Sequence, residues 1–509
     1  MQRDSATISL WQENIPDYIP NDFVFSNKSY DVIIVGGGIT GVTTALLLQN
    51  AGKKCLLIEA QNLAFGTTCG TTAHLNTILD LTYAEIQQNF GEENTKMVLA
   101  ATLEAINLVE KNVRKYNIDC DFREKRGYLF STTKTETSKL EEAFKASINA
   151  GCDVAYSDTI PVPVDFEKAL VFKRQAQIDP VKYVYALAKE FESAGGRILQ
   201  HCRVANLKEN GDEHLKVETP SGNIDTHFLI YATHIPPGVN LLHFRCAPYR
   251  SYAIAVTLNG DYPQDLAYDL GDPYHYYRTQ EKNGVKYLVA GGEDHRTGEE
   301  KDTEQCFSRL ENYLRKYFAI NEVAYKWSSQ YFESADGLPY IGHLPGNPKT
   351  VFVATGYGGN GITYSQVAAQ ILTDLIVNGH SDFEEVFNPS RVKPVAGFAN
   401  FVKNAVDVTV NFIDKLIPSE KIKGLDEIKK GEAKLVNFEN QSVALYKDEN
   451  GKIHSVNPAC THINCTVAWN TAEKTWECPC HGSRFNEKGE MFTAPARKDL
   501  EKILLEKPD

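Results

Sequence analysis

The chain has 509 residues, which is too many for a single hydrophobic core, so two or three domains are expected. Its 42% hydrophobic and 23% charged residues are typical of a soluble globular protein. A formal net charge of -13 argues against a nucleic-acid partner, because proteins that bind nucleic acids normally present a basic face.

The first residues, MQRDSATISLWQ, lack the basic and then apolar pattern of a secretory signal, and they contain no twin arginine. We therefore expect residues 1–29 to form an N-terminal arm and the protein to be cytoplasmic. A cytoplasmic chain is not expected to use its eleven cysteines as a disulfide scaffold, since that compartment keeps thiols reduced. Seven cysteines lie singly along the chain, whereas four fall between Cys460 and Cys480 among histidines.

The segment that follows the arm predicts a strand, a tight turn and a helix. The strand is the run DVIIV after Tyr30, glycines form the turn, and ITGVTTALLLQNAG has the length and apolar spacing of a helix. A second strand, CLLIE, then ends at Glu59, and a β-α-β unit of this kind predicts a parallel sheet. The stretch 32–52 is long enough to cross a bilayer, but its glycine cluster favours a nucleotide-binding turn, so no transmembrane segment is expected.

Further strands are predicted at 228–233, 287–292 and 351–356, and a helix is predicted at 180–195, which extends the α/β region to about residue 390. Apolar residues at helical spacing between 394 and 418 predict a connecting helix within a linker at 391–423. An alternative is that this helix lies on a membrane surface, which would give the protein a peripheral contact with the membrane. Short β-like runs from residue 424 predict a small all-β domain at 424–509.

The glycine turn carries the spacing of a dinucleotide site. Gly36, Gly38 and Gly41 lie between the strand and the helix, and Glu59 closes the second strand. Glycines let the backbone approach a pyrophosphate, the helix N-terminus favours its negative charge, and the carboxylate can accept a hydrogen bond from a ribose hydroxyl. A purely structural turn is the alternative, but the full β-α-β context favours nucleotide binding.

Two pairs of cysteine and histidine lie on two loops of the small β domain: Cys460 with His462, and Cys478 with His481. In a Rieske centre two thiolates hold one iron and two imidazoles hold the other, and these ligand types match. A tetrahedral zinc site is the alternative, since zinc also binds cysteine and histidine at such spacings.

The surrounding sequences, CTHINC and CPCHGSRF, resemble the Rieske proteins of respiratory and photosynthetic cytochrome complexes. The resemblance implies that Cys460, His462, Cys478 and His481 bind a 2Fe-2S cluster and that Cys465 and Cys480 form a disulfide, with free thiols as the alternative in a reducing compartment. It also implies that Ser483 donates a hydrogen bond to a cluster sulfur. Phe485 stands where high-potential members have a tyrosine donor, so we expect a lower reduction potential than theirs.

Several motifs in order along the chain resemble the D-amino-acid-oxidase-like FAD oxidoreductases, a family that includes glycine, sarcosine and γ-glutamylputrescine oxidases. They are GTTCGTTA (66–73), YATHIPPG (231–238), DGLPYIG (336–342) and ATGYGGNGITYSQVAAQ (354–370). The resemblance implies a Rossmann-like α/β FAD-binding domain and an α+β substrate domain within 30–390. The FAD-binding parts would be about 30–115, 170–235 and 330–390, and the substrate parts about 116–169 and 236–329.

Joined to a C-terminal Rieske domain, this arrangement looks like the bacterial Rieske-containing FAD-dependent oxidoreductases. It implies non-covalent FAD. The expected contacts are Gly36, Gly38, Ile39, Thr40, Gly41, Glu59, Ala60, Gly66, Thr67, Thr68, Thr71, Thr72, Ala73, Val204, Ala232, Thr233, Gly356, Gly358, Asn360, Gly361, Ile362 and Thr363.

Amino-acid oxidases of this family place an arginine a few residues before the DG-x-P motif, where it grips the substrate carboxylate. This chain has Tyr331 near that position, which weakens the case for a simple α-amino acid as substrate. Tyr252, Tyr276, Arg278 and Tyr331 are candidate substrate contacts, and packing within a sheet is the alternative role for each.

Together these features predict an FAD-dependent dehydrogenase that oxidises an amine, an amino-acid derivative or a similar small donor. Its electrons would pass through the Rieske cluster to an external one-electron acceptor, either a protein or a quinone. Two alternatives remain: a reductase or redox-partner protein that accepts electrons from a ferredoxin, and a redox-sensing protein with little turnover.

Overall fold

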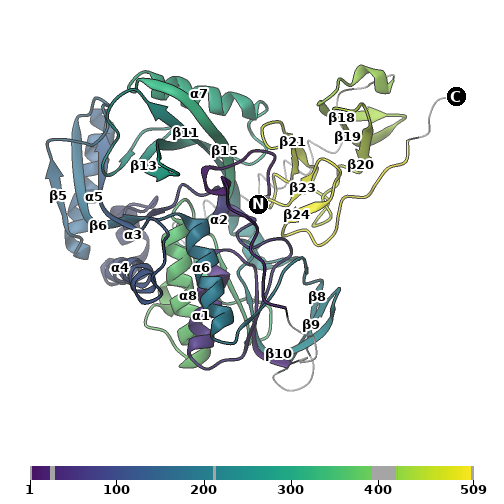
Figure 1. Ribbon diagram of the computed structural model, residues 1–509, viewed down its shortest axis with the longest axis horizontal. Coiled ribbons are helices and arrows are strands. Elements are labelled where there is room, and N and C mark those ends of the chain that lie inside the picture. The colour runs from purple at the N-terminus through teal and green to yellow at the C-terminus, as the bar shows by residue number, and fades with distance from the viewer. Residues whose placement is uncertain are drawn as a thin grey trace.

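A computed structural model describes residues 3–22, 29–209, 214–391, 420, 422 and 424–505 of the chain. Figure 1 shows a sheet with helices stacked beside it, a larger second sheet above, and a small β domain to one side. The predicted connecting helix at 394–418 lies outside the described residues.

The first sheet is parallel at its centre, in agreement with the predicted β-α-β unit. Its path runs β16-β17-β10-β1-β2-β7, and β1 pairs in parallel with both β2 and β10. Antiparallel β16, β8 and β9 complete it at the edges. The strands are β1 (Ser29–Val35), β2 (Cys55–Ile58), β7 (Arg197–Leu199), β8 (Asn206–Glu209), β9 (Leu215–Thr219), β10 (Gly222–Tyr231), β16 (Tyr340–His343) and β17 (Val351–Thr355).

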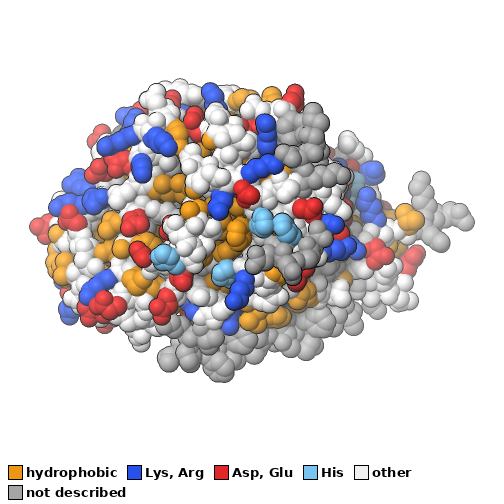
Figure 2. Space-filling view, turned by 90° about the horizontal axis from the view of Figure 1, so that it is seen from below, with side chains coloured by type: hydrophobic (Ala, Val, Ile, Leu, Met, Phe, Trp, Pro, Cys, Tyr) orange, Lys and Arg blue, Asp and Glu red, His pale blue; other side chains and the backbone are white. Residues whose placement is uncertain are grey.

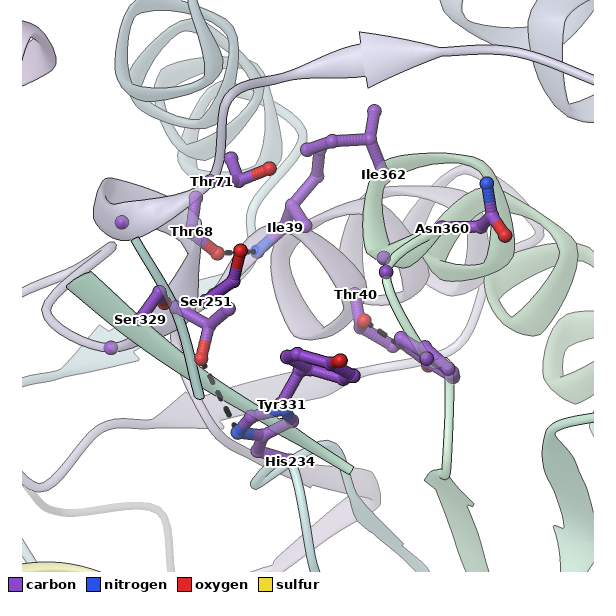
Figure 3. A pocket seen from close by; sticks show the side chains of 18 of the residues that line it. Ile39, Thr40, Thr68, Thr71, His234, Ser251, Ser329, Tyr331, Asn360 and Ile362 are labelled. Carbon is purple, nitrogen blue, oxygen red and sulfur yellow. Dashed lines mark hydrogen bonds between the residues drawn. The ribbon is translucent and has the colours of Figure 1, made fainter. Parts of the chain in front are cut away.

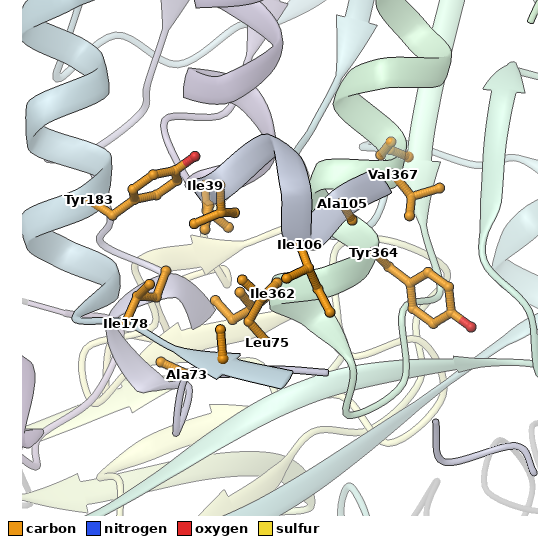
Figure 4. Close-up of a cluster of buried hydrophobic side chains, with 14 of the residues drawn as sticks. Ile39, Ala73, Leu75, Ala105, Ile106, Ile178, Tyr183, Ile362, Tyr364 and Val367 are labelled. Carbon is orange, nitrogen blue, oxygen red and sulfur yellow. The ribbon is translucent and has the colours of Figure 1, made fainter. Parts of the chain in front are cut away.

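The helices beside this sheet form one hydrophobic core with it. Figure 4 shows apolar side chains from several of them meeting, among them Ile39, Ile106, Tyr183 and Val367, all of which are buried. The predicted helix at 180–195 is α6, whose start is fixed by Asp179, since its carboxylate accepts hydrogen bonds from two backbone N–H groups of the first turn. The α-helices of the described residues, among which α7 packs on the second sheet instead, are α1 (Ile39–Asn50), α2 (Thr67–Gly70), α3 (Tyr83–Phe90), α4 (Glu92–Lys115), α5 (Lys134–Ala150), α6 (Pro180–Ser193), α7 (Thr303–Arg315), α8 (Gly361–Val377) and α9 (Glu384–Phe387).

The second sheet is largely antiparallel and runs β15-β11-β14-β13-β12-β4-β6-β3, with β5 paired to β6. Its strands are β3 (His74–Leu75), β4 (Arg123–Ser131), β5 (Val154–Ser157), β6 (Lys168–Gln177), β11 (Cys246–Leu258), β12 (Leu266–Asp269), β13 (Tyr276–Lys282), β14 (Val285–Arg296) and β15 (Ile320–Ser334). Three of these, β3, most of β6 and the end of β15, lie in stretches that the sequence assigned to the FAD-binding parts. Each of these strands nevertheless pairs into the second sheet.

The C-terminal domain is all-β, as predicted, and it contains two small antiparallel sheets. The first is β18-β19-β20 and the second is β21-β22-β23-β24. Two loops project from it, one between β20 and β21 and one between β22 and β23. The strands are β18 (Ala433–Phe438), β19 (Gln441–Lys447), β20 (Ile453–Val456), β21 (Ala468–Asn470), β22 (Thr475–Glu477), β23 (Arg484–Asn486) and β24 (Met491–Thr493).

The N-terminal arm contacts all three parts of the molecule, and its residues 3–4 and 9–12 are buried. Its purple trace in Figure 1 passes between the second sheet and the C-terminal domain. Backbone hydrogen bonds join Asp4 to Phe65 and Ala6 to Glu473, while the Trp11 indole donates to the carbonyl of Thr71 at 2.6 Å. The arm is therefore part of the folded core.

On the face seen in Figure 2, acidic and basic side chains are interspersed, with apolar side chains in small groups between them. Among the helices that the structure describes, none combines the length and the apolar character that crossing a membrane requires.

Candidate functional site

A cavity of about 600 Å³ lies between the two large sheets, at the end of β1 where the glycine turn begins. Figure 3 shows side chains that border it, with Thr40, Thr68 and Asn360 from the helix starts and Tyr331 from β15. The expected FAD contacts that line it are Gly36, Gly38, Ile39, Thr40, Glu59, Ala60, Gly66, Thr67, Thr68, Thr71, Thr72, Val204, Ala232, Thr233, Gly358, Asn360, Gly361 and Ile362.

Four expected contacts lie behind this lining. A Cβ at Gly41 would stand 1.9 Å from the carbonyl oxygen of Gly36, so this glycine serves close packing of helix on turn. Thr363 uses its hydroxyl to donate to the carbonyl of Asn76 at 2.9 Å. Ala73 accepts from Arg278 through its carbonyl, and Gly356 has the positive φ of +75° that favours glycine.

The nucleotide end of the cavity fits a pyrophosphate and a ribose. Helix α1 begins at the cavity, and Thr68 accepts a hydrogen bond from the backbone N–H of Ile39 at 3.0 Å, which fixes this helix start. Glu59 accepts from the backbone N–H groups of Gly37 at 2.6 Å and Gln61 at 2.8 Å. Burial raises the pKa of Glu59, and these hydrogen bonds oppose that effect. A helix N-terminus beside glycine backbone is the usual anion site of dinucleotide folds.

The C-terminal domain supplies part of the cavity wall, which the sequence did not indicate. Residues 491–494, 496 and 497 line it, which are β24 and the segment directly after it. Arg203 donates to the carbonyls of Met491 and Phe492 at 3.2 and 3.4 Å, and the ring of Phe492 meets that of Phe65 edge-on at 5.7 Å. Contacts between segments so distant in sequence leave no local pattern to detect.

The four predicted cluster ligands come together on the two projecting loops of the C-terminal domain. Cys460, Cys478 and His481 are fully buried. The Nδ1 atoms of both His462 and His481 are buried without a hydrogen-bond partner in the described structure, while Nε2 of His462 donates to the carbonyl of Gly238 at 3.1 Å. A histidine whose Nε2 is held by a carbonyl presents Nδ1 to a metal, so these side chains fit a two-thiolate, two-imidazole cluster.

The two loops are joined covalently, because the structure pairs Cys465 with Cys480 in a disulfide. Hydrogen bonding with Cys478 lowers the pKa of the Cys460 thiol, and hydrogen bonds from the backbone N–H of His462 and from the Ser483 hydroxyl act in the same direction. The Ser483 hydroxyl is thus close enough to donate a hydrogen bond to the sulfur of Cys460. Phe485 is fully buried in the same domain.

The two imidazoles face the segment that connects β10 to β11. His243, in the short helix η2 (Leu241–Phe244), meets His462 edge-on with ring centres 4.7 Å apart, and Phe244 meets His481 at 5.7 Å. A short loop connects this helix to Ala232 and Thr233, which line the cavity.

Strand β15 separates the cavity from the cluster loops. Ser329, Tyr331 and Glu333 line the cavity. The alternate residues point the other way, since side chains of a strand alternate between faces. Gln330 donates from Nε2 to the carbonyl of Gly482 at 2.8 Å, next to His481, while the Gln330 carbonyl accepts from the Thr67 hydroxyl at 3.1 Å.

Of the candidate substrate contacts, Tyr276 and Tyr331 line the cavity, and Tyr252 and Arg278 do not. Tyr252 points to the opposite face of β11, where its hydroxyl meets His295 at 3.0 Å. Arg278 is fully buried and donates to the carbonyls of Thr72 and Ala73, so it supports the cavity wall from behind. The carboxyl side chains of Asp80 and Glu333 line the cavity but were not predicted.

A family model described as FAD dependent oxidoreductase matches residues 31–375, and one described as Rieske [2Fe-2S] domain matches residues 420–504. A putative Rieske 2Fe-2S iron-sulfur protein of Bacillus subtilis, YhfW, is 33% identical over 94% of both chains. The γ-glutamylputrescine oxidoreductase of Escherichia coli is 22% identical over 75% of this chain and 92% of its own. Glycine oxidase from Geobacillus kaustophilus has a similar structure, with a TM-score of 0.57 and 18% identity over 72% of this chain and all of its own.

Proposed function

Because this chain belongs to the family of FAD-dependent oxidoreductases and ends in a Rieske [2Fe-2S] domain, we propose that it is a dehydrogenase in which FAD oxidises a small amine or amino-acid derivative and the Rieske cluster carries the electrons to an external acceptor. Cys460, His462, Cys478 and His481 would hold the cluster. The lining from Gly36 to Ile362 described above would hold FAD.

FAD, when bound, would supply hydride acceptance from a donor carbon, and the cluster would supply transfer of one electron at a time. An amine R–CH2–NH2 that gives up two electrons and two protons leaves as the imine R–CH=NH, which water hydrolyses. The two electrons then reduce two molecules of a one-electron acceptor, either a protein or a quinone. The part played by the chain is to orient the donor and to hold the two redox groups close together.

The position of β15 supports this relay more than any other observation. One face of this strand borders the cavity through Tyr331, and the other contacts the cluster loop through Gln330. A second connection runs along the chain itself, from Thr233 in the cavity wall to His243 beside His462. Only the thickness of one strand and its side chains separates the two sites at this wall.

The test is anaerobic addition of donors to the holoenzyme, with flavin absorbance and the EPR signal of the reduced Rieske cluster followed together. We expect the flavin to bleach first and the EPR signal to appear afterwards. Cys478→Ser is the matched variant, and it should lose the EPR signal while flavin bleaching by the donor persists. Bleaching without cluster reduction in the wild-type protein would refute the relay, and rapid cluster reduction by ferredoxin with no active donor would indicate the opposite direction of electron flow.

A further inference from the structure

One part of the cavity is acidic. Asp80, which follows β3, and Glu333, on β15, both present carboxyl groups to it. One oxygen of Asp80 accepts from the backbone N–H of Gly359 at 2.5 Å, which places this carboxylate at the turn before α8. Glu333 lies two residues beyond Tyr331 on the same face of the strand, so both side chains border the same space.

A third carboxyl group lies close by. Asp294 on β14 has both oxygens buried without a hydrogen bond of standard geometry in the described structure. Burial raises the pKa of Asp294 to about 7, and the charge of Asp80 adds to this effect. Burial likewise raises the pKa of Glu333 to about 7, followed by the charges of Asp80 and Asp294. The three carboxyl groups therefore lie close enough for their charges to affect one another's pKa.

Basic side chains do not balance these acids. Among the described residues that line the cavity, the only Lys or Arg side chains are Arg203 and Arg497. Arg203 interacts with Glu59 at the nucleotide end, and Arg497 donates to the carbonyl of Pro237. Neither contacts Asp80 or Glu333, so negative charge in that part of the cavity has no cation from the described chain.

Tyrosine rings complete this acidic part of the cavity. Tyr274 and Tyr276 lie with ring centres 5.6 Å apart, and both line the space together with Tyr331. Figure 3 shows the Tyr331 ring projecting into the cavity from β15. The faces of aromatic rings attract cations, and tyrosines beside carboxylates are a common way to bind an ammonium group.

We propose that Asp80, Glu333 and the surrounding tyrosines bind the ammonium group of a cationic amine donor that needs no carboxylate. This inference rests on the proposed function and names its substrate class. An α-amino acid would bring its own carboxylate into a space where two carboxyl groups already lie and where no arginine is available to hold it. An amine without a carboxylate brings only its positive ammonium group to these carboxyl groups.

Binding can be measured apart from turnover. Benzyltrimethylammonium carries a permanent positive charge and cannot form an imine, and phenylacetate is an anion of similar size. We expect calorimetric titration of the oxidised holoenzyme to show the cation binding at least about 10-fold more tightly than the anion, a difference of about 1.4 kcal/mol. Glu333→Gln should weaken cation binding by about 10-fold or more. Glu322→Gln, an exposed carboxylate on the same strand, should leave it unchanged.

The outcomes separate this inference from the proposed function. Equal or tighter binding of phenylacetate, or cation binding that Glu333→Gln does not change, would overturn the inference. If the cation binds tightly but no donor bleaches the flavin, the binding site stands and the proposed oxidation fails. If amino acids bleach the flavin while simple amines do not, and phenylacetate is the tighter ligand, the oxidation stands and the cation preference fails.

Discussion

A buried group of charges joins the C-terminal domain to the rest of the molecule, and removing one of them should loosen that joint. Glu477 accepts hydrogen bonds through one oxygen from Arg250 on β11 and from Arg484 on β23, and Arg484 in turn pairs with Asp4 of the N-terminal arm. Arg250 and Arg484 are fully buried and Glu477 is 3% exposed. Although burial acts to raise it, the two guanidinium groups hold the pKa of Glu477 below its usual value.

The size of the expected loss in free energy of unfolding follows from that burial. Glu477→Gln keeps the shape of the side chain but leaves the guanidinium of Arg250 without its counterion in the interface, and breaking a buried ion pair from one side costs about 3–5 kcal/mol. Glu311→Gln is the matched control, because Glu311 pairs with Arg315 and Lys326 at the surface, where such pairs contribute about 0–1 kcal/mol.

Urea denaturation of the holoenzyme, followed by tryptophan fluorescence, measures the loss of stability. Anaerobic stopped-flow spectroscopy measures the rate at which the cluster is reduced after the flavin bleaches. We expect Glu477→Gln to unfold at lower urea and to reduce its cluster more slowly after the flavin bleaches, while Glu311→Gln behaves as the wild type. Equal stability and equal cluster reduction in both variants would refute the view that this charge group holds the two redox domains together. Since the pKa of Glu477 is lowered in the folded state, its contribution to the free energy of unfolding should be present above about pH 4.5. This contribution should be lost as the pH falls through the folded-state pKa.

Three further predictions concern single side chains. Phe485→Tyr should raise the reduction potential of the cluster by about 60–130 mV, the equivalent of one hydrogen bond to a charged group, and an unchanged value in a redox titration would contradict this. Phe492→Ala should weaken FAD retention by about 10-fold or more, measured by flavin fluorescence after dialysis, because the ring that meets Phe65 is lost; retention equal to wild type would show that the domain contact is not needed. Glu333→Gln should be more stable than wild type at pH 8 by about 3 kcal/mol and equally stable at pH 4, since a carboxyl group whose pKa is raised from 4.5 to about 7 destabilises the fold as the pH rises from the lower value through the higher one; a constant difference across this range would argue against the raised pKa.

Features set by local sequence could be predicted, and the structure shows why. Gly36 and Gly38 occupy one turn between β1 and α1, and the ligand pairs around Cys460 and Cys478 each occupy one loop, so spacing alone brings their atoms together. The fold class followed from the same signals, because the β-α-β unit and the short strands after residue 424 are patterns of neighbouring residues.

Features set by register could not be predicted. Ser251 and Ala253 line the cavity, so Tyr252 between them must point into the core, and only the pairing of β11 with its neighbours fixes which face is which. Glu333 belongs to the cavity for the same reason, as the alternate residue after Tyr331. The sequence predicted an N-terminal arm but not its contacts: its polar residues Arg3 and Asp4 are buried against partners more than 300 residues away.

The wall that residues 491–497 add to the cavity has a consequence for how the protein matures. A cofactor whose cavity is walled partly by a domain that is synthesised after the FAD-binding part should enter most readily before that domain docks. We expect FAD to be taken up during or before assembly of the two halves, so that chains whose iron-sulfur domain has already closed over an empty cavity would accept the flavin slowly. Loss of flavin from the finished protein would then require the same opening, which links the lifetime of the bound cofactor to the strength of an interface between domains.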